Sequence, residues 1–236
     1  TELKTEDVEA LRRGGVNLEA HIENLKQYGV PVVVAVNRFD TDSQAELDEV
    51  AAICERCGAD FALSDVFARG GDGGIELAEK VHALTKKYNV PLIIDDRIDV
   101  ALAVGAEGVH LGKEDMPIAT ARRILGDNFI IGATAKTVPW ALEAYEGGAD
   151  YLGVGAIYPT TTKVKTVLTS TDTLADICKA VPIPVNAIGG LNKNNIDVLA
   201  GIPIAGICVV SAIMKAESPK IATIELKARA KELGII

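Results

Sequence analysis

The chain has few cysteines, no long apolar run and no excess of basic residues, and each of these features excludes a class of protein. Four cysteines in 236 residues are too few for the disulfide scaffold of a small secreted domain. No apolar run approaches the length of a membrane span, and the N-terminus lacks a signal-peptide pattern. A net charge of −9 disfavours nucleic acid and anionic membranes as partners. We therefore expect a cytoplasmic protein with reduced thiols.

One close pair of cysteines, Cys54 and Cys57, has the CxxC spacing found in zinc and redox sites. The pair lies inside a predicted helix over residues 42–58, and no second pair of ligands accompanies it. We interpret these two thiols as buried or half-buried side chains rather than as metal ligands.

Short runs rich in β-branched residues alternate with amphipathic helical patterns along the chain. The runs are apolar without strict alternation, as in strands that are buried on both faces of a parallel sheet. The eight predicted strands cover residues 30–39, 59–65, 90–96, 107–112, 128–134, 150–157, 183–190 and 204–212. A helical pattern lies before each strand, and the one before the first strand covers residues 17–29.

Eight such units predict an α/β fold, a closed (β/α)₈ TIM barrel with an extra N-terminal helix. An open doubly wound sheet usually has fewer strands and an early GxGxxG run, which this chain lacks. No linker or low-complexity tract interrupts the series. We therefore expect a single domain over residues 1–236.

The working residues of such a barrel lie at the carboxyl ends of its strands and in the loops that follow. Gly190 and Ser211 follow strands seven and eight, where small residues let backbone N–H groups approach a phosphate. Alternatively, Gly190 serves only to form a tight turn. The loop after strand six reads YPTTTK and offers hydroxyls from Thr160 and Thr162 and the cation of Lys163 to a pyrophosphate leaving group.

Two carboxylates, Asp96 and Asp115, follow adjacent predicted strands and could hold one hard cation. Mg²⁺ typically binds one or two carboxylates together with waters and substrate phosphate oxygens. Salt bridges from Asp96 to Arg97 or Arg122 are the alternative. His110 lies inside a predicted strand with no carboxylate or serine at a suggestive spacing, so we expect a core or surface role for it.

Several runs after about residue 84 match one family in order and spacing. They are VPLIIDDRIDVALAVGAEGVHLGKEDMP, IIGATAKT, ADYLGVGAIYPTTTK, IPVNAIGG and GICVVSAI. Over residues 85–236 the chain thus resembles thiamine phosphate synthase. That family joins 4-amino-5-hydroxymethyl-2-methylpyrimidine diphosphate to a thiazole phosphate and releases pyrophosphate with Mg²⁺. The resemblance implies a transferase of thiamine biosynthesis with small phosphorylated substrates and a Mg²⁺ cofactor.

The same resemblance implies a role for each matching position. Asp96 and Asp115 match the metal ligands, and Thr134 and Lys163 match catalytic residues near the pyrimidine diphosphate. Asp95 stands where the family usually has asparagine, which adds a negative charge beside the metal and removes an amide donor. The positions that match the thiazole-phosphate site are Thr160, Thr161, Thr162, Gly190, Val210 and Ser211.

The first part of the chain, about residues 17–84, carries the runs NLEAHIENLKQYGVPVVVAVNRFDTD and ALSDVFARGGDGGIELAEKV. These runs resemble a C-terminal piece of formate–tetrahydrofolate ligase, in which Phe39 and Phe67 would flank a ligand ring. The phosphate-binding loop of that ligase is absent from this sequence, so we do not expect ATP-driven formate activation. We infer a chimera of a ligase-derived part, residues 1–84, and a synthase-derived part, residues 85–236. The abrupt seam near Leu84 favours an engineered protein.

Strand two differs from the family in its charged residues. Thiamine phosphate synthases carry a Gln-x-Arg-x-Lys run there that grips the diphosphate, whereas this chain has DFALSD with only Arg69 beyond it. Such donors are worth about 3–4 kcal/mol each in a transition state. We therefore expect a folded barrel that binds phosphate and Mg²⁺ but has weak or no synthase activity. Two alternatives stay open, an active thiamine phosphate synthase and a folate- or purine-binding remnant of the ligase.

Overall fold

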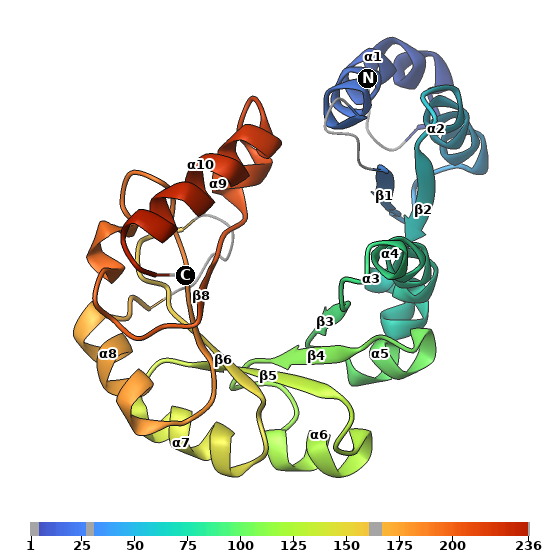
Figure 1. Ribbon diagram of the computed structural model, residues 1–236. Coiled ribbons are helices and arrows are strands. Elements are labelled where there is room, and N and C mark those ends of the chain that lie inside the picture. The colour runs from blue at the N-terminus through green and yellow to red at the C-terminus, as the bar shows by residue number, and fades with distance from the viewer. Residues whose placement is uncertain (1–4, 27–30, 161–166, 236) are drawn as a thin grey trace. The chain divides into compact units, whose positions relative to one another are not determined.

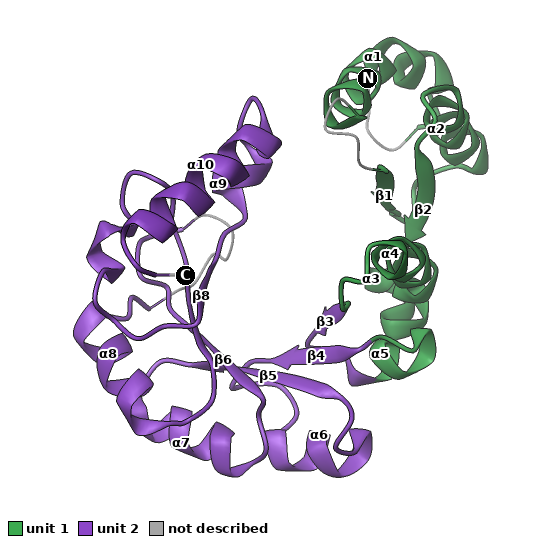
Figure 2. Ribbon diagram, in the orientation of Figure 1, with its two compact units in different colours: residues 1–92, 99–106 green, residues 93–98, 107–236 purple. Residues whose placement is uncertain are grey.

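The computed structural model describes residues 5–26, 31–160 and 167–235. The chain forms two compact units, which are residues 1–92 with 99–106 (unit 1) and residues 93–98 with 107–236 (unit 2), as Figure 2 shows. The eight predicted strands are present, two of them in one parallel sheet and six in another. The expectation of a single domain over residues 1–236 stays a prediction. None of the helices within the described residues is long and apolar enough to cross a membrane.

Unit 1 contains a two-stranded parallel sheet with helices between and after its strands (Figure 1). Strand β1 pairs with β2 in a register that places Val33 opposite Asp60 and Asn37 opposite Ser64. The elements of the unit are α1 (Val8–Lys26), β1 (Val33–Asn37), α2 (Gln44–Arg56), β2 (Asp60–Ser64), α3 (Val66–Arg69), η1 (Gly70–Gly74), α4 (Ile75–Lys87) and α5 (Ile98–Val104).

The first helix begins earlier than the sequence led us to expect. We predicted a helix over residues 17–29, whereas α1 starts at Val8 and runs through Gly14 and Gly15. A Cβ atom at Gly15 would lie 2.7 Å from the side chain of Ile53 on α2. The glycine is therefore a packing residue that lets the two helices approach closely, and not a helix end.

Helix α2 begins at a capping box and buries a cysteine. The Ser43 hydroxyl accepts a hydrogen bond from the Glu46 N–H, and the Glu46 carboxylate accepts one from the Ser43 N–H. Backbone donors of Asp7 and Ser43 lower the pKa of Glu46. Burial raises the pKa of Cys54, which keeps this thiol protonated, and all four cysteines are free. Cys54 is buried and Cys57 is half-buried, as the interpretation of the CxxC pair expects.

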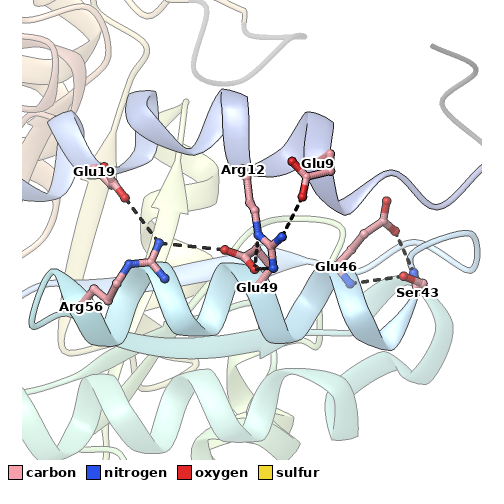
Figure 3. A network of polar contacts seen from close by, with 7 residues as sticks. All are labelled: Glu9, Arg12, Glu19, Ser43, Glu46, Glu49 and Arg56. Carbon is pink, nitrogen blue, oxygen red and sulfur yellow. Dashed lines mark hydrogen bonds and ion pairs between the residues drawn. The ribbon is translucent and has the colours of Figure 1, made fainter.

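Ion pairs join α1 to α2 (Figure 3). Arg12 pairs with Glu9 at 2.8 Å and with Glu49 at 2.9 Å, and Arg56 lies 3.6 Å from Glu19. The guanidinium groups are about half exposed, so solvent screens them and the pairs stabilise the unit only weakly.

Unit 2 is a curled six-stranded sheet in which every neighbouring pair of strands is parallel, in the order β3-β4-β5-β6-β7-β8. Its elements are β3 (Ile93–Asp95), β4 (Gly108–Leu111), α6 (Ile118–Leu125), β5 (Ile130–Ala135), α7 (Val138–Glu146), β6 (Tyr151–Val154), α8 (Thr171–Ala180), β7 (Val185–Ile188), η2 (Ile196–Leu199), β8 (Gly206–Cys208), α9 (Ser211–Met214) and α10 (Pro219–Glu232). Helices α6, α7 and α8 cover the outer face of the sheet (Figure 1). Fully buried Leu152, Leu174 and Ile177 form the core between them.

One predicted helix of unit 2 is largely wrong. The pattern over residues 192–201 predicted an α-helix, whereas the structure has only the short 3₁₀ helix η2 there. The side-chain oxygens of Asn192 and Asn195 accept hydrogen bonds from the N–H groups of Asn194 and Asn192. Such local bonds compete with the regular hydrogen bonds of an α-helix.

Candidate functional site at the carboxyl edge of unit 2

The predicted site residues of unit 2 lie at one edge of its sheet. Because all six strands are parallel, their carboxyl ends share this edge, where the loops of an α/β barrel carry function. Asp95 is the last residue of β3 and Asp96 follows it, Thr134 lies near the end of β5, and Gly190 follows β7. Val210 and Ser211 follow β8, and Ser211 begins α9.

The two predicted metal ligands follow neighbouring paired strands, β3 and β4. Asp96 has a left-handed backbone with φ of 63°, and its N–H donates to the carbonyl of His110 on β4 at 2.8 Å. Asp115 turns back toward its own strand, because its Oδ2 accepts from the Gly112 N–H at 2.6 Å. Within the described residues no group of three His, Cys, Asp or Glu side chains is arranged to hold a metal.

The predicted alternative partner Arg122 is engaged elsewhere. Its guanidinium pairs with Asp150 at 2.6 Å and donates to the carbonyls of Gly148, Gly126 and Phe129. Those residues precede β5 and β6, so they lie at the amino ends of the strands. A salt bridge from Asp96 to Arg122 is thus wrong.

Lys113, in the loop after β4, is also engaged away from the two carboxylates. Its ammonium pairs with Glu143 and lies 5.5 Å from the centre of the Trp140 ring. A cavity of about 240 Å³ beside these three side chains is bordered by Gly112 and Thr134. Trp140 packs against the core of the unit.

Three polar side chains from consecutive strands form a hydrogen-bonded chain that the sequence did not reveal. His110 on β4 lies 3.1 Å from the Tyr151 hydroxyl through Nδ1 and 3.0 Å from the Thr134 hydroxyl through Nε2. The rings of His110 and Tyr151 are 5.5 Å apart. A core or surface role for His110 is therefore an incomplete description, because it contacts a predicted site residue directly. Burial, with the charges of Cys208 and Asp95, raises the pKa of Tyr151 to about 12.

Two glycines leave the space for this chain of side chains. Gly132 lies opposite both His110 and Tyr151 in the strand register. A Cβ atom there would meet the Tyr151 ring at 2.1 Å and His110 Nδ1 at 2.5 Å, and one at Gly153 would meet His110 Cε1 at 3.2 Å. Glycine inside a strand weakens it and often marks a close approach of another group.

Replacement of Gly132 by alanine is expected to destabilise the protein by about 1–3 kcal/mol, the usual cost of overpacking a core. Gly14→Ala is the matched control, because no atom lies within 4 Å of the added methyl group and alanine favours a helix by up to about 1 kcal/mol over glycine. Urea unfolding of the two variants should therefore shift in opposite directions. Equal midpoints for Gly132→Ala and the parent would show that the space at Gly132 is not required.

The loop after β6 packs on the turn after β7, which brings together two parts of the predicted thiazole-phosphate site. The Tyr158 N–H donates to the Gly189 carbonyl at 3.0 Å. Gly190 has a φ of 64°, and a Cβ atom there would lie 2.7 Å from the Pro159 carbonyl oxygen. Thr160 follows directly and is half-buried. The remaining predicted residues of this loop, Thr161, Thr162 and Lys163, lie outside the described residues.

Unit 1 has its own polar hollow at the carboxyl ends of β1 and β2. Arg38 and Arg69 line a cavity of about 130 Å³ together with Asp65, Asp72 and Glu76. The sequence indicated only Arg69 as a cation near strand two, and Arg38 is a second one. The predicted ring-flanking residues, Phe39 and Phe67, are 65% and 95% exposed, and their role in ligand binding stays a prediction.

The parallel strands with helices outside place this chain in the α/β barrel class. A family model described as thiamine monophosphate synthase matches residues 73–213. The thiamine-phosphate synthase 2 of Streptococcus pneumoniae is 56% identical over 142 residues, which are 60% of this chain and 68% of the relative. The thiamine-phosphate synthase of Lacticaseibacillus paracasei is 40% identical over 183 residues, which are 78% of this chain and 85% of the relative.

A solved structure is similar to this chain in both sequence and fold. The thiamine phosphate pyrophosphorylase from Pyrococcus furiosus is 36% identical, with a TM-score of 0.63, and the match covers 86% of this chain and 96% of that one. The predicted α/β TIM-barrel fold class is thereby confirmed. The chain belongs to the thiamine-phosphate synthase family. A second family model, formate–tetrahydrofolate ligase, matches residues 1–106 and overlaps the first.

The expectation of weak or absent activity is wrong in the light of these comparisons. Identities of 40–56% to thiamine-phosphate synthases favour an active enzyme. That expectation rested on the missing basic run of strand two and on a ligase origin for residues 1–84. The match to the Lacticaseibacillus protein covers more residues than 84–236 contains, so the similarity extends into that first part.

Proposed function

We propose that this chain is an active thiamine-phosphate synthase that joins the pyrimidine diphosphate to the thiazole phosphate and releases pyrophosphate. In this transfer the thiazole nitrogen forms a bond to the pyrimidine methylene carbon, and the diphosphate leaves with the electron pair of the broken C–O bond. The observations that carry the proposal are the identity of 56% to a named synthase over 142 residues and the synthase family model over residues 73–213, a range that includes the carboxyl ends of β3 to β8.

The donors of Asp96 and Asp115 fit Mg²⁺. Both are carboxylates, the hard oxygen ligands that this ion prefers, and two of them leave positions for waters and phosphate oxygens. Asp115 directs one oxygen to the Gly112 N–H, which fixes the orientation of its carboxylate. A bound Mg²⁺ would neutralise charge on the diphosphate. Asp95, next to Asp96, would contact the pyrimidine substrate.

Two groups of residues would handle the phosphates. Thr134 and Lys163 would donate to the leaving diphosphate, where hydrogen bonds and charge stabilise the transition state. The thiazole phosphate would lie against the backbone at Gly190, where the absence of a side chain permits close approach. Its other proposed contacts are Thr160, Thr161, Thr162, Val210 and Ser211.

The first part of the chain has a separate origin in this proposal. The ligase family model over residues 1–106 supports a fusion in which residues 1–84 derive mainly from a formate–tetrahydrofolate ligase and complete one barrel domain with residues 85–236. The synthase family model begins at residue 73, so similarity to the synthase extends into the end of the first part.

The direct test is release of pyrophosphate by the purified chain with both substrates and Mg²⁺. We expect turnover that stops when either substrate is left out or when a chelator removes the metal, and that returns when Mg²⁺ is added. Pyrophosphate release that needs only the pyrimidine diphosphate would indicate hydrolysis and would contradict the proposal.

A further inference from the structure

The side chains of Tyr151, His110 and Thr134 form a line that runs from the middle of the sheet to its carboxyl edge. His110, Gly132 and Tyr151 lie in one row across β4, β5 and β6, and Thr134 lies two residues nearer the carboxyl end of β5 than Gly132. The hydrogen bonds of 3.1 and 3.0 Å therefore connect the half-buried Tyr151, the first residue of β6, to a residue of the proposed site.

One arrangement of the protons in this line satisfies all three side chains. The pKa of Tyr151 is raised to about 12, so its hydroxyl keeps its proton at neutral pH. When this hydroxyl donates to Nδ1 of His110, the neutral imidazole carries its own proton on Nε2. The Nε2–H then donates to the Thr134 oxygen. The Thr134 proton then points away from the histidine and is free for another acceptor.

We propose that Tyr151 is a positioning residue that acts through His110 to hold the Thr134 hydroxyl as a hydrogen-bond donor toward the diphosphate leaving group. The proposal depends on the synthase function proposed above. A threonine hydroxyl rotates freely about its C–O bond, and an acceptor orientation would place lone pairs against an anionic group. The fixed orientation contributes to kcat, because the charge on the leaving group grows in the transition state.

The glycines on β5 and β6 support a dedicated arrangement. Two neighbouring strands carry Gly132 and Gly153 at the positions where a Cβ atom would strike Tyr151 or His110. An apolar core would fill these positions with side chains, which stabilise a strand better than glycine does. The space is instead occupied by a tyrosine and a histidine that bond to each other.

A double-mutant cycle tests the proposal on the full chain. Tyr151→Phe removes one hydroxyl and is expected to lower kcat about tenfold, with KM for both substrates changed less than twofold. In a Thr134→Val background the same change should have no further effect, since the hydroxyl that it positions is gone. In a Thr134→Ser background, which keeps the hydroxyl, the tenfold effect should return. A tenfold effect in all three backgrounds, or no effect in the parent, would overturn the proposal.

Controls separate this outcome from a loss of structure and from a failure of the proposed function. Tyr145→Phe, at a partly exposed tyrosine on α7, should leave kcat unchanged.

If the parent chain does not convert its substrates, the synthase proposal fails. The direction of the hydrogen bonds can still be measured by nitrogen NMR of the histidines above pH 8. His82 is an internal reference, because its Nδ1 donates to the Val104 carbonyl. His110 should show the opposite tautomer, with the proton on Nε2, and a proton on Nδ1 would refute the proposed direction.

Discussion

Asp96→Asn is expected to lower kcat about 10²–10³-fold, the range measured when one stabilising group is removed from an active site. The substitution removes the negative charge that would hold Mg²⁺, while the size of the side chain stays nearly the same. Asp96 has a φ of 63°, and asparagine is one of the few residues that adopt this left-handed conformation readily. Loss of activity would thus come from the site and not from the backbone.

The metal dependence of this variant identifies the cause. The Mg²⁺ concentration that gives half-maximal activity should rise for Asp96→Asn and for Asp115→Asn. Asp127→Asn is the control, since Asp127 follows α6 at the opposite edge of the sheet. An unchanged kcat and an unchanged Mg²⁺ requirement in both site variants would show that the two carboxylates are not metal ligands.

Gly190→Ala is expected to raise KM for the thiazole phosphate more than tenfold, with a smaller effect on KM for the pyrimidine diphosphate. The added Cβ atom would meet the Pro159 carbonyl oxygen and the Tyr158 side chain, each at 2.7 Å. The Pro159 carbonyl belongs to the backbone and cannot move aside as the end of a flexible side chain can. The whole loop that carries Thr160 would therefore shift. The proposed phosphate contacts of this loop would then move away from those of the turn at Gly190.

A second glycine provides the control for backbone strain. Gly201 also has a positive φ, 80°, but no atom lies within 4 Å of an added Cβ atom. Gly201→Ala should therefore cost about 1 kcal/mol of stability, as a left-handed non-glycine residue does, and leave both KM values unchanged. Equal KM changes in the two variants would assign the effect to strain and refute the phosphate contact at Gly190.

Much of the fold and the edge that carries the site could be predicted because both depend on local patterns. Alternating helical and strand patterns predict parallel pairing, and parallel pairing predicts which end of each strand carries function. Asp96, Thr134 and Gly190 lie at that edge for this reason. The helix over residues 192–201 could not be excluded in the same way, since the asparagine side chains that replace its hydrogen bonds show themselves only in three dimensions.

The chain of Tyr151, His110 and Thr134 was not predictable, because it depends on strand register. These residues are far apart in sequence, and no spacing rule links a histidine to a tyrosine 41 positions later. The sequence gives only an indirect signal, because β5 and β6 each contain a glycine inside the strand. Such glycines point to a close approach without naming the group that approaches.

The most direct measurement is the formation of thiamine phosphate by the unmodified chain, followed by mass spectrometry in the presence of both substrates and Mg²⁺. We predict steady turnover with one pyrophosphate released for each thiamine phosphate formed, and near-complete loss of both products in Asp96→Asn. A parent chain that forms no thiamine phosphate above the enzyme-free background would contradict the assignment of this edge as a synthase active site.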